Sequence, residues 1–380
     1  MFTGAEDVFR GNRGRLASLM EQENIDTLIL LGEPNIIYAT GIREPTGALI
    51  LSKNCTPTYI VSILDYTRIS GQLPSDFQVR VAYRASDETV RIDIPKRLVS
   101  GKSLLDTVIS EASKCGGRIG VDLDWTSHSM ASRLTGKLEA VNVSDLIRRA
   151  RSVKSNGEVE LIRRAAGIAD EALRRLLDDI HAGASEAELA GLLRLYMLRL
   201  ESWGEAFPSI VAFYSNTAYP HHTPTSIQLG SPGPILIDWG AIYSGYRSDS
   251  TRMLHYGRPN SSFKRHYEVL LQAQLEAIDT VAAGVEASDP DTQARRVLAR
   301  EGLDGKFIHG LGHGVGVEIH EDPYLRPGSK TVLEPGMIVT VEPGIYLEGA
   351  YGIRVEDTIL VTKSGSVQLT RFTKTLLEFQ

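Results

Sequence analysis

Two aspartates on either side of a turn-like segment restrict the folds open to this chain of 380 residues. Asp238 ends an apolar run at 235–237, and Asp249 follows a turn-like segment at 243–245. A hairpin about that turn brings Asp238 and Asp249 nearly opposite each other, where cross-strand side chains lie about 5 Å apart. Two carboxylates this close in a largely apolar sheet repel each other, or one is protonated, unless a cation lies between them. The segment therefore predicts an antiparallel hairpin with a metal site.

The same arrangement recurs near the C-terminus. Glu342 and Glu356 are equally distant in sequence from Gly349, which belongs to a turn-like segment at 348–350. A second hairpin about Gly349 would again place two carboxylates face to face. We therefore expect two hairpins, each with a facing acidic pair.

A segment rich in histidine and glycine lies between the two hairpins. Residues 307–323 contain His309, His313 and His320 among glycines that let the backbone approach a ligand closely. Four carboxylates and an imidazole suit manganese, cobalt or iron better than structural zinc, whose usual ligands are cysteine and histidine. Two such ions can share a bridging water, lower its pKa and polarise a carbonyl. We expect two divalent ions, Mn²⁺ or Co²⁺ with Zn²⁺ or Fe²⁺ as alternatives, and a hydrolytic reaction.

The length of the chain and the order of its predicted elements favour two domains. In the first half, short strand-like runs alternate with helical stretches, which indicates an α/β domain over residues 1–150. Its expected helices cover residues 8–24, 103–113 and 127–136, and its expected strands cover residues 27–31, 48–51, 58–61, 79–82 and 118–122.

A capping box marks the start of the second domain. Ser155 and Glu158 have the spacing of its two members, so a long helix should run from there to about residue 180. Residues 146–154 are basic, and we interpret them as a solvated linker face, with a docking patch for an acidic partner as the alternative. Further helices (186–201, 262–282 and 289–301) and antiparallel hairpins indicate an α+β domain over residues 151–380.

Composition excludes several classes of protein. The formal net charge of −6 and the pI near 5.9 lack the basic excess of nucleic-acid binders. The chain has no apolar run of about 18 residues that could span a bilayer, and its polar N-terminus lacks the apolar stretch of a signal peptide. We therefore expect no membrane association and a cytoplasmic location. The two cysteines, Cys55 and Cys115, are expected to be free thiols of core type.

These motifs resemble those of the creatinase/aminopeptidase family of metallopeptidases, which have the pita-bread fold. Residues 34–41 resemble the family's N-x-x-Y-x-T/S-G segment, and residues 151–155 resemble its interdomain signature. The resemblance extends over almost the whole chain and includes the proline-specific members, the Xaa-Pro dipeptidases and Xaa-Pro aminopeptidases. It implies an α/β N-terminal domain, an α+β catalytic domain with a curved antiparallel sheet, and a homodimer.

The resemblance also assigns five metal ligands. Asp249 and Glu356 match the family's bridging carboxylates, and Asp238 matches a ligand of one metal only. His313 and Glu342 match the ligands of the other metal. The complete set argues against creatinase, which lacks these ligands, and against family members that have lost activity and act as scaffolds.

Further roles follow from the same resemblance. Glu342 matches a proton shuttle to the attacking water, while His221 and His320 match histidines that hydrogen-bond the substrate and the tetrahedral intermediate. His309 matches an active-site histidine of the proline peptidases that contacts substrate. Arg354 matches an arginine that holds substrate or orients the metal-bound carboxylates.

Three of these residues keep an alternative when they are considered alone. His309 could be a structural histidine, and Arg354 could form a salt bridge inside the sheet. His222 could face the site in place of its neighbour His221.

The implied reaction is hydrolysis of a peptide bond whose nitrogen belongs to proline, with release of the N-terminal residue. That bond is a tertiary amide without an N–H. The expected substrate is a small Xaa-Pro peptide, and the first alternative is a longer peptide cleaved by an Xaa-Pro aminopeptidase. A methionine aminopeptidase is a further alternative, against which the large N-terminal domain argues, and the last is a non-catalytic scaffold.

Overall fold

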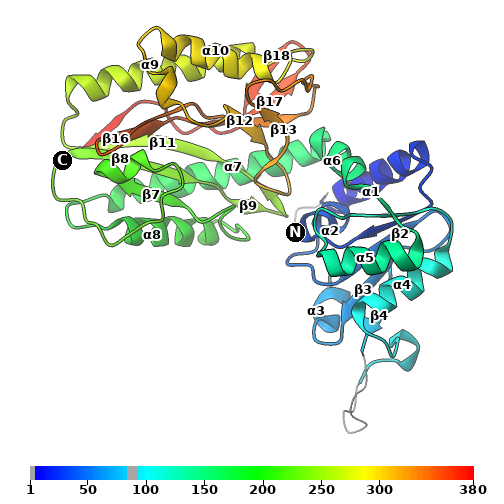
Figure 1. The fold of residues 1–380 in the computed structure, drawn as a ribbon. Helices are drawn as coiled ribbons and strands as arrows, with labels where there is room; N and C mark the ends of the chain where they lie inside the picture. Colours follow the sequence, from blue (N-terminus) through cyan, green and yellow to red (C-terminus); the bar gives the residue numbers. More distant parts are fainter. Residues whose placement is uncertain (1–4, 84–92) are drawn as a thin grey trace. The chain divides into compact units, whose positions relative to one another are not determined.

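The computed structural model describes residues 5–83 and 93–380. It divides into two compact units, Met1–Arg151 and Ser152–Gln380, and Figure 1 labels most of their elements. Within the described residues, every helix is too short or too polar to cross a membrane.

The first unit is built around a six-stranded mixed sheet. Its strands are β1 (Thr27–Leu30), β2 (Ala48–Ser52), β3 (Thr58–Ser62), β4 (Gln78–Ala82), β5 (Ile119–Val121) and β6 (Val141–Asn142). Its helices are α1 (Ala5–Gln22), α2 (Glu33–Thr40), α3 (Tyr66–Ser70), α4 (Leu104–Cys115), α5 (His128–Leu138) and α6 (Ser144–Ser152), with a 3-10 turn at Lys96–Leu98. The strand order is β4-β3-β2-β1-β5-β6. All four residues of β1 are buried, which indicates that both faces of the sheet are covered.

The helices and strands predicted for this half are all present, with ends shifted by a few residues. Helices α2, α3 and α6 and strand β6 are additional. The interpretation of residues 146–154 as a solvated linker is wrong, because α6 buries Leu146, Ile147 and Ala150, whose spacing places them on one helix face. Lys154 is also buried, with its Nζ 2.7 Å from Oε1 of Glu321.

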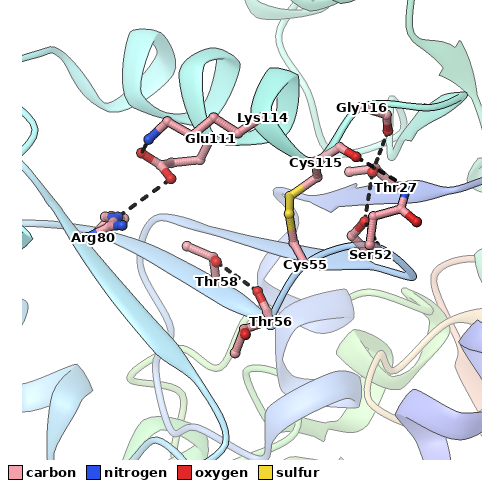
Figure 2. Close-up of a disulfide and its surroundings, with 11 residues drawn as sticks. Thr27, Ser52, Cys55, Thr56, Thr58, Arg80, Glu111, Lys114, Cys115 and Gly116 are labelled. Atoms are coloured by element: carbon pink, nitrogen blue, oxygen red, sulfur yellow. Dashed lines mark hydrogen bonds and ion pairs between the residues drawn. A yellow bond between two sulfur atoms is a disulfide. The ribbon is translucent and has the colours of Figure 1, made fainter.

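The two cysteines form a disulfide, so the prediction of free thiols is wrong. Figure 2 shows Cys55, in the connection from β2 to β3, bonded to Cys115 at the end of α4. Their Cα atoms are 5.5 Å apart, within the usual range for a disulfide. The pair is 60 residues apart in sequence, and only the folded sheet and helix bring the two positions together.

The second unit places two pairs of helices on opposite faces of its strands (Figure 1). The helices are α7 (Asn156–Leu176), α8 (Glu186–Arg199), α9 (Ser261–Thr280) and α10 (Ser288–Ala299), with 3-10 turns at Leu177–Asp179, Tyr214–Ala218 and Asp304–Lys306. The strands are β7 (Ile210–Phe213), β8 (Gly233–Trp239), β9 (Ile242–Tyr243), β10 (Tyr246–Arg247), β11 (Ser250–Tyr256), β12 (Gly312–Gly314), β13 (Glu321–Leu325), β14 (Ile338–Val341), β15 (Gly344–Leu347), β16 (Tyr351–Arg354), β17 (Asp357–Thr362), β18 (Gly365–Gln368) and β19 (Leu377–Phe379).

Two larger sheets in this unit have the orders β19-β11-β8-β7 and β13-β12-β14-β17-β18. A bridge between Thr251 and Glu356 connects β11 to the residue just before β17. Along β8, Ile237 packs in the cluster with α7 and α8, whereas Leu236 packs in the cluster with α9 and α10. Because strand side chains alternate between faces, Asp238 lies on the same face as Leu236.

The helices and hairpins predicted for this half are present. Helix α7 begins after Ser155 with the predicted capping box: the backbone N–H of Glu158 donates to Ser155 Oγ at 3.3 Å, and the backbone N–H of Ser155 donates to Glu158 Oε2 at 2.8 Å. Two orphan donors at the helix start are thereby satisfied.

Candidate metal centre

The first predicted hairpin is present with a small offset in register. Tyr243 pairs with Tyr246, and Asp238 pairs with Thr251. Asp249 therefore lies two residues before the partner of Asp238 instead of directly opposite it. The turn falls at residues 244–245, and Gly245 has a φ of 85°, in the region that favours glycine.

The second hairpin has the predicted register. Val341 pairs with Asp357 on one side of the acidic pair, and Gly344 pairs with Arg354 on the other. Glu342 and Glu356 therefore lie opposite each other.

Ligand atoms from both hairpins meet at His313. One atom each from Asp249, His313 and Glu356 lie within 4.8 Å of one another, and all three residues are buried. His313 Nε2 is 3.6 Å from Asp249 Oδ2 and 3.2 Å from Glu342 Oε1. This spacing allows a metal ion to be held by oxygen and nitrogen donors together.

Asp238 has one oxygen that the protein leaves without a partner. Its Oδ2 pairs with Arg354 Nη2, but Oδ1 is buried and has no hydrogen-bond partner. A buried carboxylate oxygen without a hydrogen-bond partner lowers the stability of the folded chain. A cation at this position would satisfy it.

The electrostatics of the acidic residues also favour a cation. Burial raises the pKa of Asp249 well above its ordinary value, and the charges of Glu356 and Asp238 raise it further. Burial and the charges of Glu342 and Asp238 act in the same direction on the pKa of Glu356. Divalent ions would supply the positive charge that otherwise has to come from bound protons.

Glu342 is better compensated than its neighbours. Burial alone would raise the pKa of Glu342, but the hydrogen bond and charge of His313 outweigh burial and lower it to about 2. Thr340 Oγ1 also donates to Glu342 Oε1 at 3.1 Å. The same hydroxyl accepts the backbone N–H of His313 at 3.0 Å, so Thr340 links the two residues.

A cavity of about 1040 Å³ opens onto these groups. Its apolar wall includes Phe207, Pro208, Tyr219, Ile308 and Tyr324. Its polar lining contains every residue predicted for the site, namely His221, Asp238, Asp249, His309, His313, His320, Glu342, Arg354 and Glu356, together with His222.

The predicted histidines occupy different parts of the cavity wall. The ring of His320 packs edge-on against His313 with centroids 4.3 Å apart. Burial, followed by the charge of His313, lowers the pKa of His320 to about 4, so it is neutral near pH 7. Burial also lowers the pKa of His309, whose Nε2 lies 2.9 Å from the hydroxyl of Tyr346.

Tyr346 also belongs to the site, although it is not among the residues predicted from the sequence. Arg354 Nη1 donates to its hydroxyl at 3.0 Å, so a polar chain runs from Asp238 through Arg354 and Tyr346 to His309. One signal for Tyr346 is present in the sequence: in a strand, positions 342, 344 and 346 share a face, so Tyr346 lies on the same side as Glu342. Aromatic residues in strands usually pack in the core, which hides this signal.

The two adjacent histidines differ in their contacts. His222 Nε2 is 2.9 Å from Glu186 Oε2. His221 is close enough to His320 for its charge to lower the pKa of His320. This geometry favours His221 over His222 as the residue that faces the metal ligands.

Comparison with known proteins identifies the family. The family model described as metallopeptidase family M24 matches residues 160–363, and the creatinase/prolidase N-terminal domain matches residues 13–153. The chain belongs to metallopeptidase family M24. This M24 chain is 31% identical to the Xaa-Pro dipeptidase of Pyrococcus horikoshii over 98% of its own length and 100% of that relative.

Solved structures of similar proteins show the same fold. The Xaa-Pro dipeptidase from Bacillus anthracis has a TM-score of 0.85 at 29% identity and covers 97% of this chain and 99% of its own. The X-Pro aminopeptidase from Thermotoga maritima has a TM-score of 0.86 at 28% identity, with coverage of 96% and 99%. The predicted fold, an α/β N-terminal domain followed in the chain by a pita-bread domain, is thus confirmed. The M24 chain is a peptidase of a family that uses divalent metal.

Proposed function

We propose that this peptidase hydrolyses Xaa-Pro bonds with two divalent metal ions and releases the N-terminal residue. The observation that carries the proposal is the pair of buried acidic hairpins, which leaves Asp238 Oδ1 unpaired and holds too little positive charge for its carboxylates. Relatives named Xaa-Pro dipeptidase support the choice of substrate.

The donor atoms fit a dinuclear centre. Asp249 and Glu356 would bridge the ions, Asp238 would hold one of them, and His313 with Glu342 would hold the other. Bound divalent ions supply a nucleophilic water near neutral pH and polarise the scissile carbonyl.

The side chains around the ligands would bind substrate and move the proton. Glu342 is ionised and held by His313 and Thr340, so its carboxylate can accept a proton from the attacking water. His320 is neutral near pH 7 and, with His221, can hydrogen-bond the carbonyl oxygen as negative charge develops on it.

The cavity fits a proline ring followed by a free carboxylate. The apolar wall suits a pyrrolidine ring. Arg326 and Arg354 line the cavity. The guanidinium of Arg354 already forms an ion pair with Asp238 and hydrogen bonds with Thr251 and Tyr346. Arg326 is exposed, with its guanidinium 5.6 Å from the ring centre of Tyr324. Its charge favours dipeptides, whose carboxylate follows proline directly, over longer peptides.

The test is a side-by-side assay of Ala-Pro, Ala-Pro-Ala and Met-Ala with Mn²⁺ or Co²⁺ supplied. Cleavage of Ala-Pro with little cleavage of Met-Ala is expected. Preference for Ala-Pro-Ala would favour the aminopeptidase alternative. Full turnover in a metal-free preparation, or no cleavage of either proline peptide, would contradict the proposal.

A further inference from the structure

A fully buried glutamate outside the metal centre organises the loop that carries His221. Glu186 is the first residue of α8 and is 0% exposed. Both of its oxygens accept hydrogen bonds: Oε1 from the backbone N–H of Phe213 (2.7 Å) and Asn216 Nδ2 (2.9 Å), and Oε2 from the backbone N–H and Oγ1 of Thr225 (2.8 and 2.6 Å). Oε2 also lies 2.9 Å from His222 Nε2.

Glu186 is charged at neutral pH despite its burial. Burial alone would raise its pKa, but the hydrogen bonds from Thr225, His222 and Asn216 outweigh burial and hold the pKa below its ordinary value. An ionised carboxylate accepts stronger hydrogen bonds than a neutral group. Four residues of the segment 213–225 are therefore hydrogen-bonded to Glu186 at the start of α8. They are Phe213, Asn216, His222 and Thr225.

The same loop also has a hydrogen bond to Arg354, one of the residues around the proposed metal site. Arg354 Nη1, whose neighbouring Nη2 pairs with Asp238, donates to the carbonyl of Pro220 at 3.3 Å. His221 thus lies between two anchored neighbours, Pro220 held by Arg354 and His222 held by Glu186. His221 itself lines the cavity.

We propose that Glu186 and His222 are positioning residues that hold His221 in place for catalysis. This inference rests on the proposed function, in which His221 hydrogen-bonds the reacting carbonyl. It gives the two adjacent histidines separate roles: His221 acts on substrate, and His222 connects the loop to Glu186. A displacement of about 1 Å at a reacting group can reduce a rate about 100-fold, so anchoring of this kind affects turnover.

The first test compares variants of the anchor with a matched control. His222→Leu removes the donor to Glu186, His222→Gln can replace it, and Glu186→Gln removes the charge. Glu188→Gln removes a charge from the same helical turn, where Glu188 contacts the helix start instead of the loop. With Ala-Pro and saturating Mn²⁺, His222→Leu and Glu186→Gln should lower kcat between about 10-fold and 100-fold, with metal content unchanged. His222→Gln should recover most of the rate, and Glu188→Gln should match wild type.

A double-mutant cycle separates positioning from general support of the fold. If His222 acts through His221, His222→Leu should lower kcat in wild type but have little further effect in the His221→Ala background. Equal losses in both backgrounds, or a loss that tracks a fall in metal content, would overturn the proposal. Unchanged kcat in folded His222→Leu would overturn it as well.

Hydrogen exchange tests the anchoring without a substrate. His222→Leu should increase amide exchange in residues 214–225, whereas Glu188→Gln should not. Unchanged exchange would overturn the proposal. If wild type cleaves no Xaa-Pro peptide but the loop exchanges as expected, the proposed function fails and the anchoring of His221 by Glu186 and His222 stands.

Discussion

Two adjacent acidic residues, Glu356 and Asp357, show that burial alone does not make a metal ligand. Asp357 is fully buried, but Arg252 and Lys374 lie 2.7 and 2.6 Å from its oxygens. Burial would raise its pKa, and these two cations outweigh burial and lower it. Glu356 has no such pair of cations; burial and the charge of Glu342 raise its pKa. Two cations therefore neutralise Asp357, whereas positive charge is short at the adjacent Glu356.

Replacing Asp249 by Asn tests whether metal ions supply the positive charge that the buried carboxylates lack. The amide keeps the shape of the side chain but loses the charge that would bridge two ions. We expect metal content per chain to fall and kcat to drop by about 100-fold or more, beyond the roughly 10- to 100-fold effect of residues that only support a ligand. Elemental analysis and kinetics on Ala-Pro measure both. Asp304→Asn, at an exposed position, is the control, and wild-type kinetics in Asp249→Asn would remove Asp249 from the ligand set.

Replacing Arg326 by Gln tests whether this residue makes the enzyme prefer dipeptides over longer peptides. If Arg326 binds the carboxylate of a dipeptide, KM for Ala-Pro should rise about 10-fold, which corresponds to roughly 1.5 kcal/mol for a charged hydrogen bond. KM for the amide Ala-Pro-NH₂ should change little, because that substrate has no carboxylate. Lys330→Gln removes a charge outside the cavity lining and is the control. Equal changes for the acid and the amide would count against this role.

At the scale of elements, the disulfide connects the turn between β2 and β3 to the end of α4. Its 60-residue separation implies a stabilisation of about 2–4 kcal/mol, through the smaller conformational freedom of the unfolded chain. Dithiothreitol should therefore lower the denaturant midpoint of the first unit in wild type. The Cys55→Ser/Cys115→Ser variant should start from the lower midpoint and not respond to the reductant. A wild-type midpoint that is independent of reductant would show that the bond does not contribute.

The elements that sequence predicts correctly are those with a local signal. The capping box at Ser155 and the strands around Gly349 depend on residues close together in the chain, and both are present. The disulfide and the Glu186 anchor depend on contacts between segments 27 to 60 residues apart. A lone glutamate at the start of a helix has an ordinary local role there, so its second role is visible only in the folded chain.

At the scale of the whole molecule, the proposed metal centre lies where two sheets of the second unit meet. Asp238 and Asp249 come from the β8–β11 hairpin, whereas Glu342 and Glu356 lie between β14 and β17. Thr251 contributes to the contact between the two sides: its hydroxyl donates to Glu356 Oε2 at 2.6 Å and accepts from Arg354 Nε at 3.1 Å. Ions held by ligands from both hairpins would add a further connection between the two sides, at the point where the carboxylates repel each other.

Metal removal should therefore destabilise the second unit as well as stop turnover. A ligand that binds only the folded state stabilises it by about 2.7 kcal/mol when its concentration is 100 times its dissociation constant. Thermal unfolding of wild type in Mn²⁺ should accordingly occur at a higher midpoint than after chelation, with the difference growing with metal concentration. Asp249→Asn should lose most of this dependence, because its remaining ligands hold less charge. If the midpoint of wild type does not change with Mn²⁺ while Mn²⁺ still supports activity, the ions act in catalysis without linking the two hairpins.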